Sequence, residues 1–456
     1  MIKHLYIECT HTANSGLNTG IQRVVRHIVE QLGPRLPDNT PISLMSIDEG
    51  SFYRLDGLPD LRRKQLVEDE DSGGSDNDND APPENRGKIR VLRFLRNFRE
   101  AVLKRLTWAP LNDFLSAPRS KFGLSRIIYM LTLIGVYRAL TSKIDVSKCE
   151  SPSPISFSPG DVILMLDSSW HLPAWEAIRH AKDNGANVIV VIYDLIPITH
   201  PQFCEQALCK VFSRWFEQAE KNVDGYIAIS KTVRCSLQDY LVSLGASPDR
   251  ERLGYFYLGA DVAKEQGCAR EELMRTLRGN SYLIVSTVEP RKNHQYLLDA
   301  FNQLWGLGLD IKLHIVGRVG WRVDKLIRDI EQHPQFNAKL FLWNDLDDAE
   351  LVYCYKNSKA LVFPSYVEGF GLPIIEAQHY QLPVLASDTP IHREVGGDSV
   401  IYFDLADSVD LVTKISDVEQ GRLSLNKQAH FELTQFTWRH SANRLVQEIQ
   451  RINATL

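Results

Sequence analysis

Two kinds of apolar pattern alternate along much of this chain. Short runs of consecutive apolar residues predict buried strands, and longer segments with apolar residues at every third or fourth position predict helices. At the start of the chain, residues 3–8 predict a strand and residues 21–32 a helix. The pattern returns with strands predicted at 161–166 and 187–193 and a helix at 175–184. This order predicts a parallel sheet whose ligands bind at the carboxyl ends of its strands.

A second alternating segment begins near residue 281. Its predicted strands lie at residues 282–287, 312–316, 341–346, 360–363 and 383–387. The fourth of these leads into a loop with two glycines and a helix predicted at 372–379, where Pro373 suits the first turn. A chain of 456 residues with two such segments predicts two α/β domains, residues 1–265 and 266–435, followed by a helix within 436–456.

Residues 50–157 interrupt the alternation and predict an insertion in the first domain. Residues 68–80 are acidic and low in complexity, which predicts disorder; their D-x-D triplets do not predict a metal site, which needs carboxylates fixed at a strand end. Residues 88–148 are basic and include an amphipathic helical pattern that can lie in an anionic membrane surface. A helical insertion packed on the first domain, with its arginines in water, explains the same pattern. The apolar run at 127–137 is shorter than the ~20 residues that span a bilayer.

Composition narrows the class of protein. The apolar fraction of 44% is enough for two cores, and the net charge of −5 argues against a nucleic-acid partner. Seven scattered cysteines without a C-x-x-C pair argue against a zinc site or a disulfide framework. Cys204 and Cys209 are predicted to be buried thiols on one helix, which suits a reducing cytoplasm. We expect no signal peptide, because no long apolar segment follows a basic start.

The candidate chemistry centres on residues 364–377, where a strand, a glycine loop and a helix N-terminus follow one another. The unpaired N–H groups in the first turn of such a helix favour a phosphate. Glu368 and Glu376 bracket the loop, and their carboxylates suit hydroxyl groups beside a phosphate. A phosphate flanked by hydroxyls describes a sugar nucleotide. The alternative is an ordinary strand-to-helix turn with two carboxylates in water.

A family resemblance supports the sugar-nucleotide interpretation. The stretch E-G-F-G-L-P-I-I-E-A at residues 368–377 resembles the E-x7-E signature of retaining glycosyltransferases of family four. Residues 287–293, T-V-E-P-R-K-N, resemble the E-P-R-K-N element of that family. The resemblance implies the GT-B fold, in which two Rossmann-like domains face a cleft and the last helix crosses back to the first domain. It also implies that the donor binds the C-terminal domain and the acceptor the N-terminal one.

The resemblance also implies roles for individual residues. Arg291 and Lys292 would hold the donor diphosphate, where fixed cations stabilise the negative charge of the leaving group. Glu368 would contact the donor sugar, so that these three form the expected catalytic set; Glu376 would bind the ribose. The donor-binding residues expected on this basis are Gly20, Arg291, Lys292, Glu368, Phe370, Gly371, Leu372 and Glu376. Gly20 would let the first domain close over the phosphates. No cofactor and no metal ion are expected, because the two cations and the helix N-terminus take their place.

Other stretches match the family more loosely. Residues 193–197, Y-D-L-I-P, resemble the H-D-L-I-P element of family mannosyltransferases, with Tyr193 in place of the histidine. Asp194 is therefore a candidate on the acceptor side, or else a cap of the following turn. His200 lies just beyond and is a second acceptor-side candidate. Residues 258–261 resemble the N-G-V-D turn before the domain linker through Gly259 and Asp261, and residues 390–397 resemble a turn common in the family.

These observations lead to a functional expectation. The chain is predicted to transfer a hexose, with retention, to a lipid-linked or polysaccharide acceptor in bacterial surface glycan synthesis. The H-D-L-I-P-like and E-P-R-K-N elements favour mannose from GDP-mannose, while UDP-hexose, UDP-N-acetylhexosamine and GDP-rhamnose stay open as donors. We expect a cytoplasmic protein with peripheral contact to the inner membrane face through residues 88–148.

Two other classes of function remain open from the sequence. A sugar-nucleotide 2-epimerase shares the GT-B fold, but the Arg–Lys pair together with E-x7-E is not its pattern. A non-catalytic sugar-nucleotide-binding subunit could anchor an assembly through residues 88–148, and the intact motif carboxylates and cations argue against it. Consumption of a donor without an acceptor would favour the first, and donor binding without turnover would favour the second.

Overall fold

The structure is a computed structural model that describes residues 2–15, 20–36, 40–59, 153–168, 170–172, 174–245, 250–260, 267–425 and 433–456. These residues belong to one compact unit, Met1–Pro59 and Ser153–Leu456. The predictions for residues 68–80, 88–148 and 127–137, for Asp261 and for a domain boundary at 265/266 fall outside the described residues. Within them, no helix has the length and apolar character needed to cross a bilayer.

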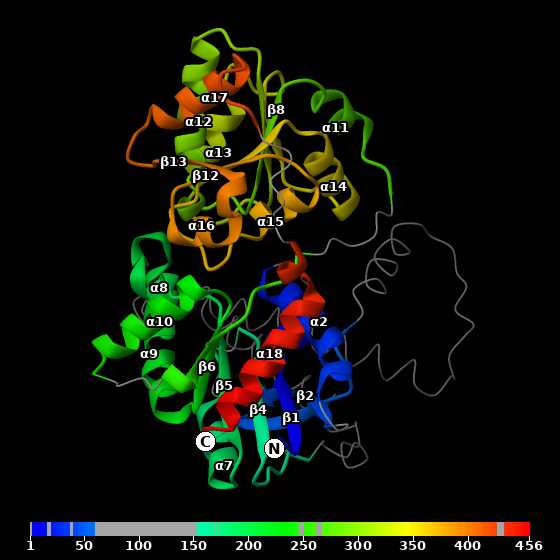
Figure 1. Cartoon of the computed structure of the whole chain (residues 1–456), viewed down its shortest axis with the longest axis vertical. Helices are drawn as coiled ribbons and strands as arrows, with labels where there is room; N and C mark the ends of the chain where they lie inside the picture. Colours follow the sequence, from blue (N-terminus) through cyan, green and yellow to red (C-terminus); the bar gives the residue numbers. More distant parts are fainter. Residues whose placement is uncertain are drawn as a thin grey trace, which may run out of the picture. The chain divides into compact units, whose positions relative to one another are not determined.

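The first body is built around a seven-stranded sheet in the order β3-β2-β1-β4-β5-β6-β7 (Figure 1). Its strands are β1 (His4–Glu8), β2 (Ile42–Asp48), β3 (Ser51–Leu55), β4 (Asp161–Met165), β5 (Asn187–Ile192), β6 (Gly225–Ala228) and β7 (Leu253–Tyr255). All neighbours pair in parallel except β3, which returns antiparallel to β2 at the edge. The predicted strands at 3–8, 161–166 and 187–193 are therefore confirmed to within one residue at either end.

Helices cover both faces of this sheet. They are α1 (Thr10–Asn14), α2 (Ile21–Leu32), α7 (Trp175–Asp183), α8 (Ile196–Thr199), α9 (Gln206–Asn222), α10 (Lys231–Ser243) and α18 (Trp438–Asn453). Successive side chains of a strand point to opposite faces. Leu5 and Ile7 of β1 accordingly join one core with α2 and α18, and Ile163 and Met165 of β4 join the other with α7, α9 and α10.

The second body contains a six-stranded, fully parallel sheet in the order β10-β9-β8-β11-β12-β13. Its strands are β8 (Ser281–Val285), β9 (Lys312–Val316), β10 (Leu340–Trp343), β11 (Ala360–Phe363), β12 (Val384–Ser387) and β13 (Val400–Phe403). The helices are α11 (Glu271–Thr276), α12 (His294–Gly306), α13 (Asp324–Glu331), α14 (Asp348–Asn357), α15 (Leu372–His379), α16 (Pro390–Gly396) and α17 (Asp410–Glu419). Two Rossmann-like sheets thus stand where the sequence predicted two alternating segments.

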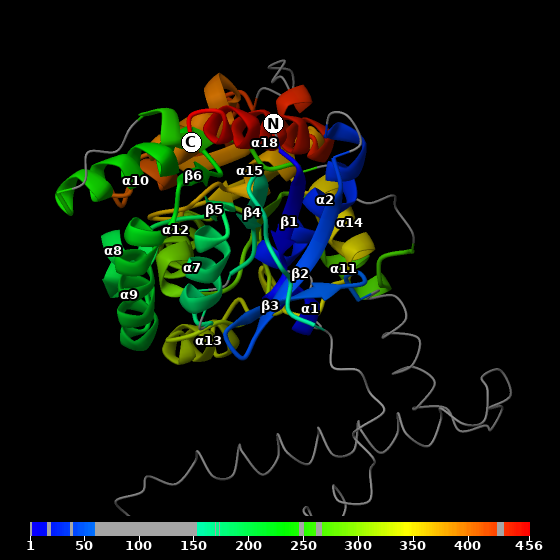
Figure 2. The same cartoon turned by 90° about the horizontal axis from the view of Figure 1, so that it is seen from below.

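The C-terminal helix α18 packs on the first sheet, although it follows the second body in the chain (Figures 1 and 2). The Asn187 side-chain amide donates to the side-chain oxygen of Asn453 at 2.9 Å. Arg451 donates to the backbone oxygens of Glu251 and Leu253 at 2.7 and 3.0 Å. These bonds tie the last helix of the chain to the first body at β5 and β7.

Two local predictions are wrong. Cys204 and Cys209 do not share a helix, because Cys204 follows the 3-10 turn Pro201–Phe203 and only Cys209 lies within α9; Cys204 is buried and Cys209 half-buried. Residues 390–397, expected as a turn, contain the helix α16. Its N-cap is Thr389, whose side chain accepts from the His392 N–H, and a proline at the first helical position pre-sets the backbone.

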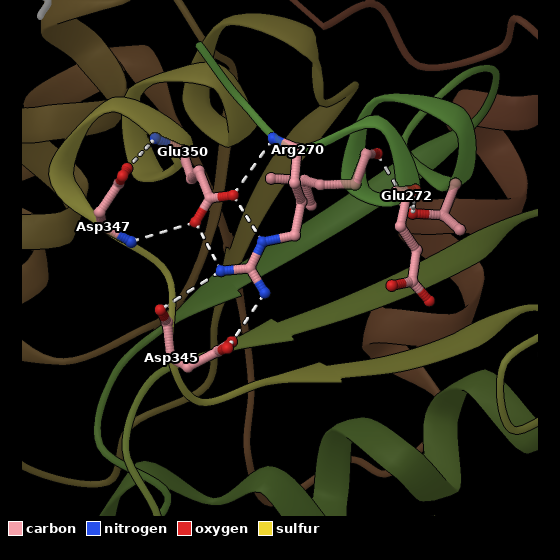
Figure 3. A network of polar contacts seen from close by, with 7 residues as sticks. Arg270, Glu272, Asp345, Asp347 and Glu350 are labelled. Carbon is pink, nitrogen blue, oxygen red and sulfur yellow. Dashed lines mark hydrogen bonds and ion pairs between the residues drawn. The ribbon is translucent and has the colours of Figure 1, made fainter. Parts of the chain in front are cut away.

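A polar network joins the start of the second body to α14 (Figure 3). Arg270, just before α11, donates to both carboxylate oxygens of Glu350 at 2.6 and 2.8 Å and to Asp345 at 3.0 Å. Glu350 also closes a capping box with Asp347 at the N-terminus of α14. This helix carries Tyr355, which reaches the candidate site described below, so the network fixes one wall of that site.

The network predicts a pH-dependent contribution to stability. Hydrogen bonds from Arg270 hold the pKa of Glu350 below its ordinary value of 4.5. The stabilisation is therefore complete above pH 4.5 and is lost as the pH falls through the lowered pKa. We expect Glu350→Gln to lower the free energy of unfolding by about 1–2 kcal/mol at pH 7, because Arg270 is partly exposed and solvent screens the pair.

Urea unfolding at pH 7 and pH 3 checks this expectation. The difference between Glu350→Gln and the wild type should shrink towards zero at the lower pH. Asp345→Asn is the matched control, because the Asp345 side chain is 62% exposed and its pairing with Arg270 should contribute little. An equal loss at both pH values for Glu350→Gln would show that the charge of Glu350 is not the source of the stabilisation.

Candidate active site

Arg291 and Lys292 lie in a tight turn after β8. The turn Pro290–Lys292 is a 3-10 helix with proline at its first position, and Asn293 after it adopts a left-handed backbone with φ of 59°. Asparagine tolerates this conformation better than most residues. The Arg291 backbone oxygen accepts from the Tyr366 N–H at 2.9 Å, which joins this turn to the loop after β11. Since β8 and β11 are neighbours in the sheet, the two motifs meet at one edge.

The glycine loop between β11 and α15 places Glu368 against both cations. One oxygen of Glu368 lies 2.6 Å from Nη1 of Arg291, and the other lies 2.5 Å from Nζ of Lys292. Arg291 also pairs through Nε with Glu289 at 2.6 Å. Glu289, Lys292 and Glu368 are all less than 10% exposed. The result is a buried cluster of two cations and two carboxylates at the carboxyl ends of β8 and β11.

The charged groups in this cluster shift one another's pKa values. Burial alone raises the pKa of Glu368, but the adjacent Arg291 and Lys292 outweigh burial and hold that pKa at about 2. Burial lowers the pKa of Lys292, and Glu368 offsets part of this effect. Glu368 is therefore a fixed carboxylate at neutral pH and a poor proton acceptor, since an efficient general base has a pKa near the working pH.

Helix α15 begins at Leu372, directly after the glycine loop. Gly371 is its N-cap, with φ of 98°, a conformation that favours glycine, and Pro373 lies in its first turn. Phe370 is buried and packs near Tyr257 and Phe436. The N-terminus of α15 thus lies beside the Arg291–Glu368 cluster, as an anion site at a helix start requires.

The glycine loop also touches the first body. A Cβ atom on Gly369 would lie 2.3 Å from the backbone oxygen of Tyr193 and 3.2 Å from the Cβ of Asp194. The Ser230 hydroxyl, at the start of α10, donates to the Gly369 oxygen at 3.1 Å. Only glycine permits this approach between the end of β5 and the glycine loop.

Of the acceptor-side candidates, Asp194 lies at this contact between the end of β5 and the glycine loop. Asp194 accepts from the Ile196 N–H at 3.0 Å, so it caps the following turn, and it also lies within the field of Arg291. Burial raises the pKa of Asp194, and Arg291 opposes the rise. Tyr193, which replaces the family histidine, points into the core and donates to the Leu166 oxygen at 2.8 Å. The ring of His200 bonds to Thr199 and stacks on a neighbouring phenylalanine.

Glu376 is held by two partners that the sequence did not indicate. Nη1 of Arg23, from α2 of the first body, lies 2.9 Å from one carboxylate oxygen, and the Tyr355 hydroxyl donates to the other at 2.8 Å. Gly20, the N-cap of α2 with φ of 54°, starts the same helix. Arg23 lies in its first turn, where a cation opposes the helix dipole. A cation in the first turn is the one local signal at Arg23, but Lys231 of α10 and Lys325 of α13 share it, so it does not mark a site residue.

Comparison with known proteins bears on this geometry. Residues 269–432, which include both motifs, match the family model of the glycosyl transferases group 1. Over these residues the chain is similar to the group 1 glycosyltransferases. The chain is 31% identical over 312 residues to the serotype-specific mannosyltransferase WbdA of Escherichia coli, and the match covers 65% of the chain but 38% of WbdA. It is 30% identical over 169 residues to the O-antigen chain mannosyltransferase B of Escherichia coli, covering 36% of the chain and 44% of that protein.

Solved structures identify the fold of the chain. Anabaena HepE in complex with UDP-glucose aligns with a TM-score of 0.52 at 13% identity, covering 99% of the chain and 98% of HepE. The lipopolysaccharide outer core galactosyltransferase WaaB aligns with a TM-score of 0.51 at 12% identity, covering both chains completely. At such identities the likeness concerns the fold alone. The predicted GT-B fold, with two Rossmann-like bodies, is confirmed.

Proposed function

We propose that the chain is a retaining glycosyltransferase that moves mannose from GDP-mannose to a bacterial surface glycan. The observation that carries this proposal is the convergence of Arg291, Lys292 and the N-terminus of α15 around Glu368. The similarity to bacterial mannosyltransferases supports the choice of sugar. Because the chain spans 38% of the length of WbdA, the whole activity of that protein is not carried over.

The cluster suits the departure of a nucleoside diphosphate. As the bond between the sugar C1 and the phosphate oxygen breaks, negative charge grows on the diphosphate. The Arg291 guanidinium is fixed by its ion pairs and the Lys292 ammonium by burial and its ion pair, so they can stabilise that charge without reorganising. The first-turn amides of α15 add partial positive charge on the same side. These groups supply the stabilisation for which other enzymes use a metal ion, and the proposal includes none.

Glu368 fits a role as acceptor of sugar hydroxyls. A carboxylate offers about four lone-pair sites, and Arg291 and Lys292 occupy one on each oxygen of Glu368. The other sites can accept hydroxyls of the donor hexose. Since its pKa is about 2, Glu368 is poorly suited to take the acceptor proton.

Retention follows from attack on the face that the diphosphate leaves. In the proposed step, the acceptor hydroxyl oxygen bonds to C1 while the C1–phosphate oxygen bond breaks, and the hydroxyl proton passes to a phosphate oxygen. In this proposal Asp194, whose pKa is influenced by Arg291, orients the acceptor hydroxyl. No carboxylate nucleophile takes part in this step.

The remaining parts of the proposal concern partners and place. We propose a lipid-linked saccharide or polysaccharide acceptor, met at the cytoplasmic face of the inner membrane. Residues 88–148 supply the basic amphipathic pattern for peripheral contact with anionic lipid. The similarity to the O-antigen chain mannosyltransferase B of Escherichia coli supports a surface glycan as the acceptor.

A donor screen tests the proposal. We expect GDP-mannose and GDP to raise the apparent melting temperature of the full chain, because a ligand that binds only the folded state stabilises it. GDP-fucose, UDP-glucose, UDP-N-acetylglucosamine and UDP should raise it less. Glu376→Ala should abolish the shift. Transfer of radiolabelled mannose from GDP-mannose to membranes of an O-antigen-producing strain then tests the reaction, and absence of both shift and transfer would overturn the proposal.

A further inference from the structure

We propose that Arg23 is a positioning residue of the donor site: together with Tyr355 it orients the Glu376 carboxylate for the two vicinal hydroxyls of the donor ribose. The inference rests on the proposed function, because it assumes that a ribonucleoside diphosphate binds at α15. It adds a residue from the first body to a site whose other polar groups come from the second. No family motif marks Arg23, which lies 353 residues from its partner in the chain.

The Glu376 carboxylate is held at both oxygens. Arg23 Nη1 donates to Oε1 at 2.9 Å, and the Tyr355 hydroxyl donates to Oε2 at 2.8 Å. Glu376 is 5% exposed and Tyr355 is 2% exposed, so neither can turn away into solvent. The two donors come from two different helices, α2 and α14. The plane of the carboxylate is therefore set by two rigid helices rather than by the rotamer preference of Glu376 itself.

This arrangement leaves a specific acceptor pattern. With about four lone-pair sites on a carboxylate, one donor on each oxygen leaves one free site on each oxygen. Two free acceptors at the spacing of a carboxylate match two adjacent hydroxyls on a five-membered sugar ring. A hydroxyl pair that binds here fills the remaining acceptor site on each oxygen, and a nucleotide that lacks one hydroxyl leaves one of these buried sites unfilled, which weakens binding.

The charge on Arg23 fits this role. Burial alone lowers the pKa of Arg23, but Glu376 raises it more, so the guanidinium stays charged at neutral pH. A cation in the first turn of α2 is unfavourable for that helix by itself. The ion pair with Glu376 offsets this unfavourable interaction with the helix dipole. The pair therefore forms when the two bodies are together, and the ribose site is complete only in that arrangement.

The competing explanation is that the Arg23–Glu376 ion pair only holds the two bodies together. The structure contains such a tie elsewhere: Glu394 of α16 accepts from the backbone N–H groups of Lys231 and Thr232 at 2.7 and 2.8 Å, at the N-terminus of α10. Glu394 joins the bodies without touching Glu376. It is therefore a control that weakens the contact between the bodies and leaves the carboxylate donors in place.

The test is nucleotide discrimination by the full chain. Dissociation constants are measured by calorimetry for GDP and 2′-deoxy-GDP, and for UDP and 2′-deoxy-UDP in parallel. For the nucleotide base that binds, we expect the wild type to prefer the ribonucleotide by at least about 10-fold, since the deoxy form leaves one acceptor site of the buried Glu376 carboxylate unfilled. In Arg23→Met this ratio should fall towards one, mainly because ribonucleotide binding weakens. Arg23→Lys should restore part of the ratio.

Two further variants distinguish orientation of the Glu376 carboxylate from a contact that only holds the two bodies together. Tyr355→Phe removes the other donor to Glu376 without touching a contact between the bodies, and it should lower the ratio in the same direction. Glu394→Gln should weaken both nucleotides alike and keep the ratio. If Arg23→Met keeps the wild-type ratio, or if it matches Glu394→Gln, the positioning role is wrong while the proposed function stands. If the wild type binds none of the four nucleotides, the proposed function fails and this inference with it.

Discussion

Replacing Lys292 with methionine is expected to lower the rate of sugar transfer by about 10²–10³-fold while changing the donor KM much less. Lys292 is 8% exposed, and its ammonium group is fixed 2.5 Å from Glu368 beside the N-terminus of α15. It therefore stabilises charge that grows on the diphosphate only as the bond breaks, and an interaction of this kind acts on turnover. Methionine keeps most of the volume of the lysine, and Arg291 still pairs with Glu368.

Initial-rate kinetics with GDP-mannose and the glycan acceptor measure this effect. The matched control is Lys359→Met, which removes a comparable pair with Glu419 at 2.8 Å; Lys359 precedes β11, at the end of that strand opposite the glycine loop. Circular dichroism should show both variants folded. Turnover unchanged in Lys292→Met, or lowered equally in Lys359→Met, would contradict the assignment of Lys292 to the leaving group.

Replacing Gly369 with alanine is expected to lower kcat/KM by about 10²-fold, because misplacing catalytic groups by about 1 Å is enough for such a loss. The added Cβ would lie 2.3 Å from the Tyr193 backbone oxygen, at the end of β5 in the middle of the first sheet. A backbone atom there cannot move aside as a flexible side chain can. The glycine loop must shift instead, and Glu368, its immediate neighbour, shifts with it away from Arg291 and Lys292.

Transfer kinetics and thermal unfolding together test this expectation. Gly33→Ala is the control, since a Cβ there meets no atom within 4 Å and the backbone is helical. The Gly369→Ala variant should also lose the bond that Ser230 donates to the Gly369 oxygen, which lowers the unfolding temperature. Activity within about twofold of the wild type would mean that the reaction does not need the close approach of Gly369 to the Tyr193 backbone oxygen.

Much of the fold could be predicted from local pattern. Strand β11 and helix α15 have the predicted bounds, because an apolar run, two glycines and a proline each limit the backbone within a few residues. Strands β2 and β3 were not predicted, although β2 alternates buried and half-buried positions. Segment 390–397 was assigned as a turn because it resembles a turn common in the family, but the Thr389 cap and the following proline start a helix there.

The site was predicted only in part. Both motifs were expected to contact one donor, and the adjacent parallel strands β8 and β11 bring them together at one edge. Glu368 and the two cations were expected to contact different parts of the donor, whereas in the structure they pair with one another. The link from Asp194 to the glycine loop through Gly369 was also not foreseen, because the spacing of a motif does not show which loop of another body it meets.

Local pattern is enough to predict most of the strands and helices and the glycine turn before α15, because periodicity, glycine and proline act over a few neighbouring residues. It also indicated the family, through residues that lie close together in two short stretches. Only the tertiary structure decided which charges meet, as Arg23 and Glu376 do across 353 residues. An ion pair needs only two opposite charges at the right distance, and a chain with 52 basic and 57 acidic residues offers far too many candidates for their order alone to select one.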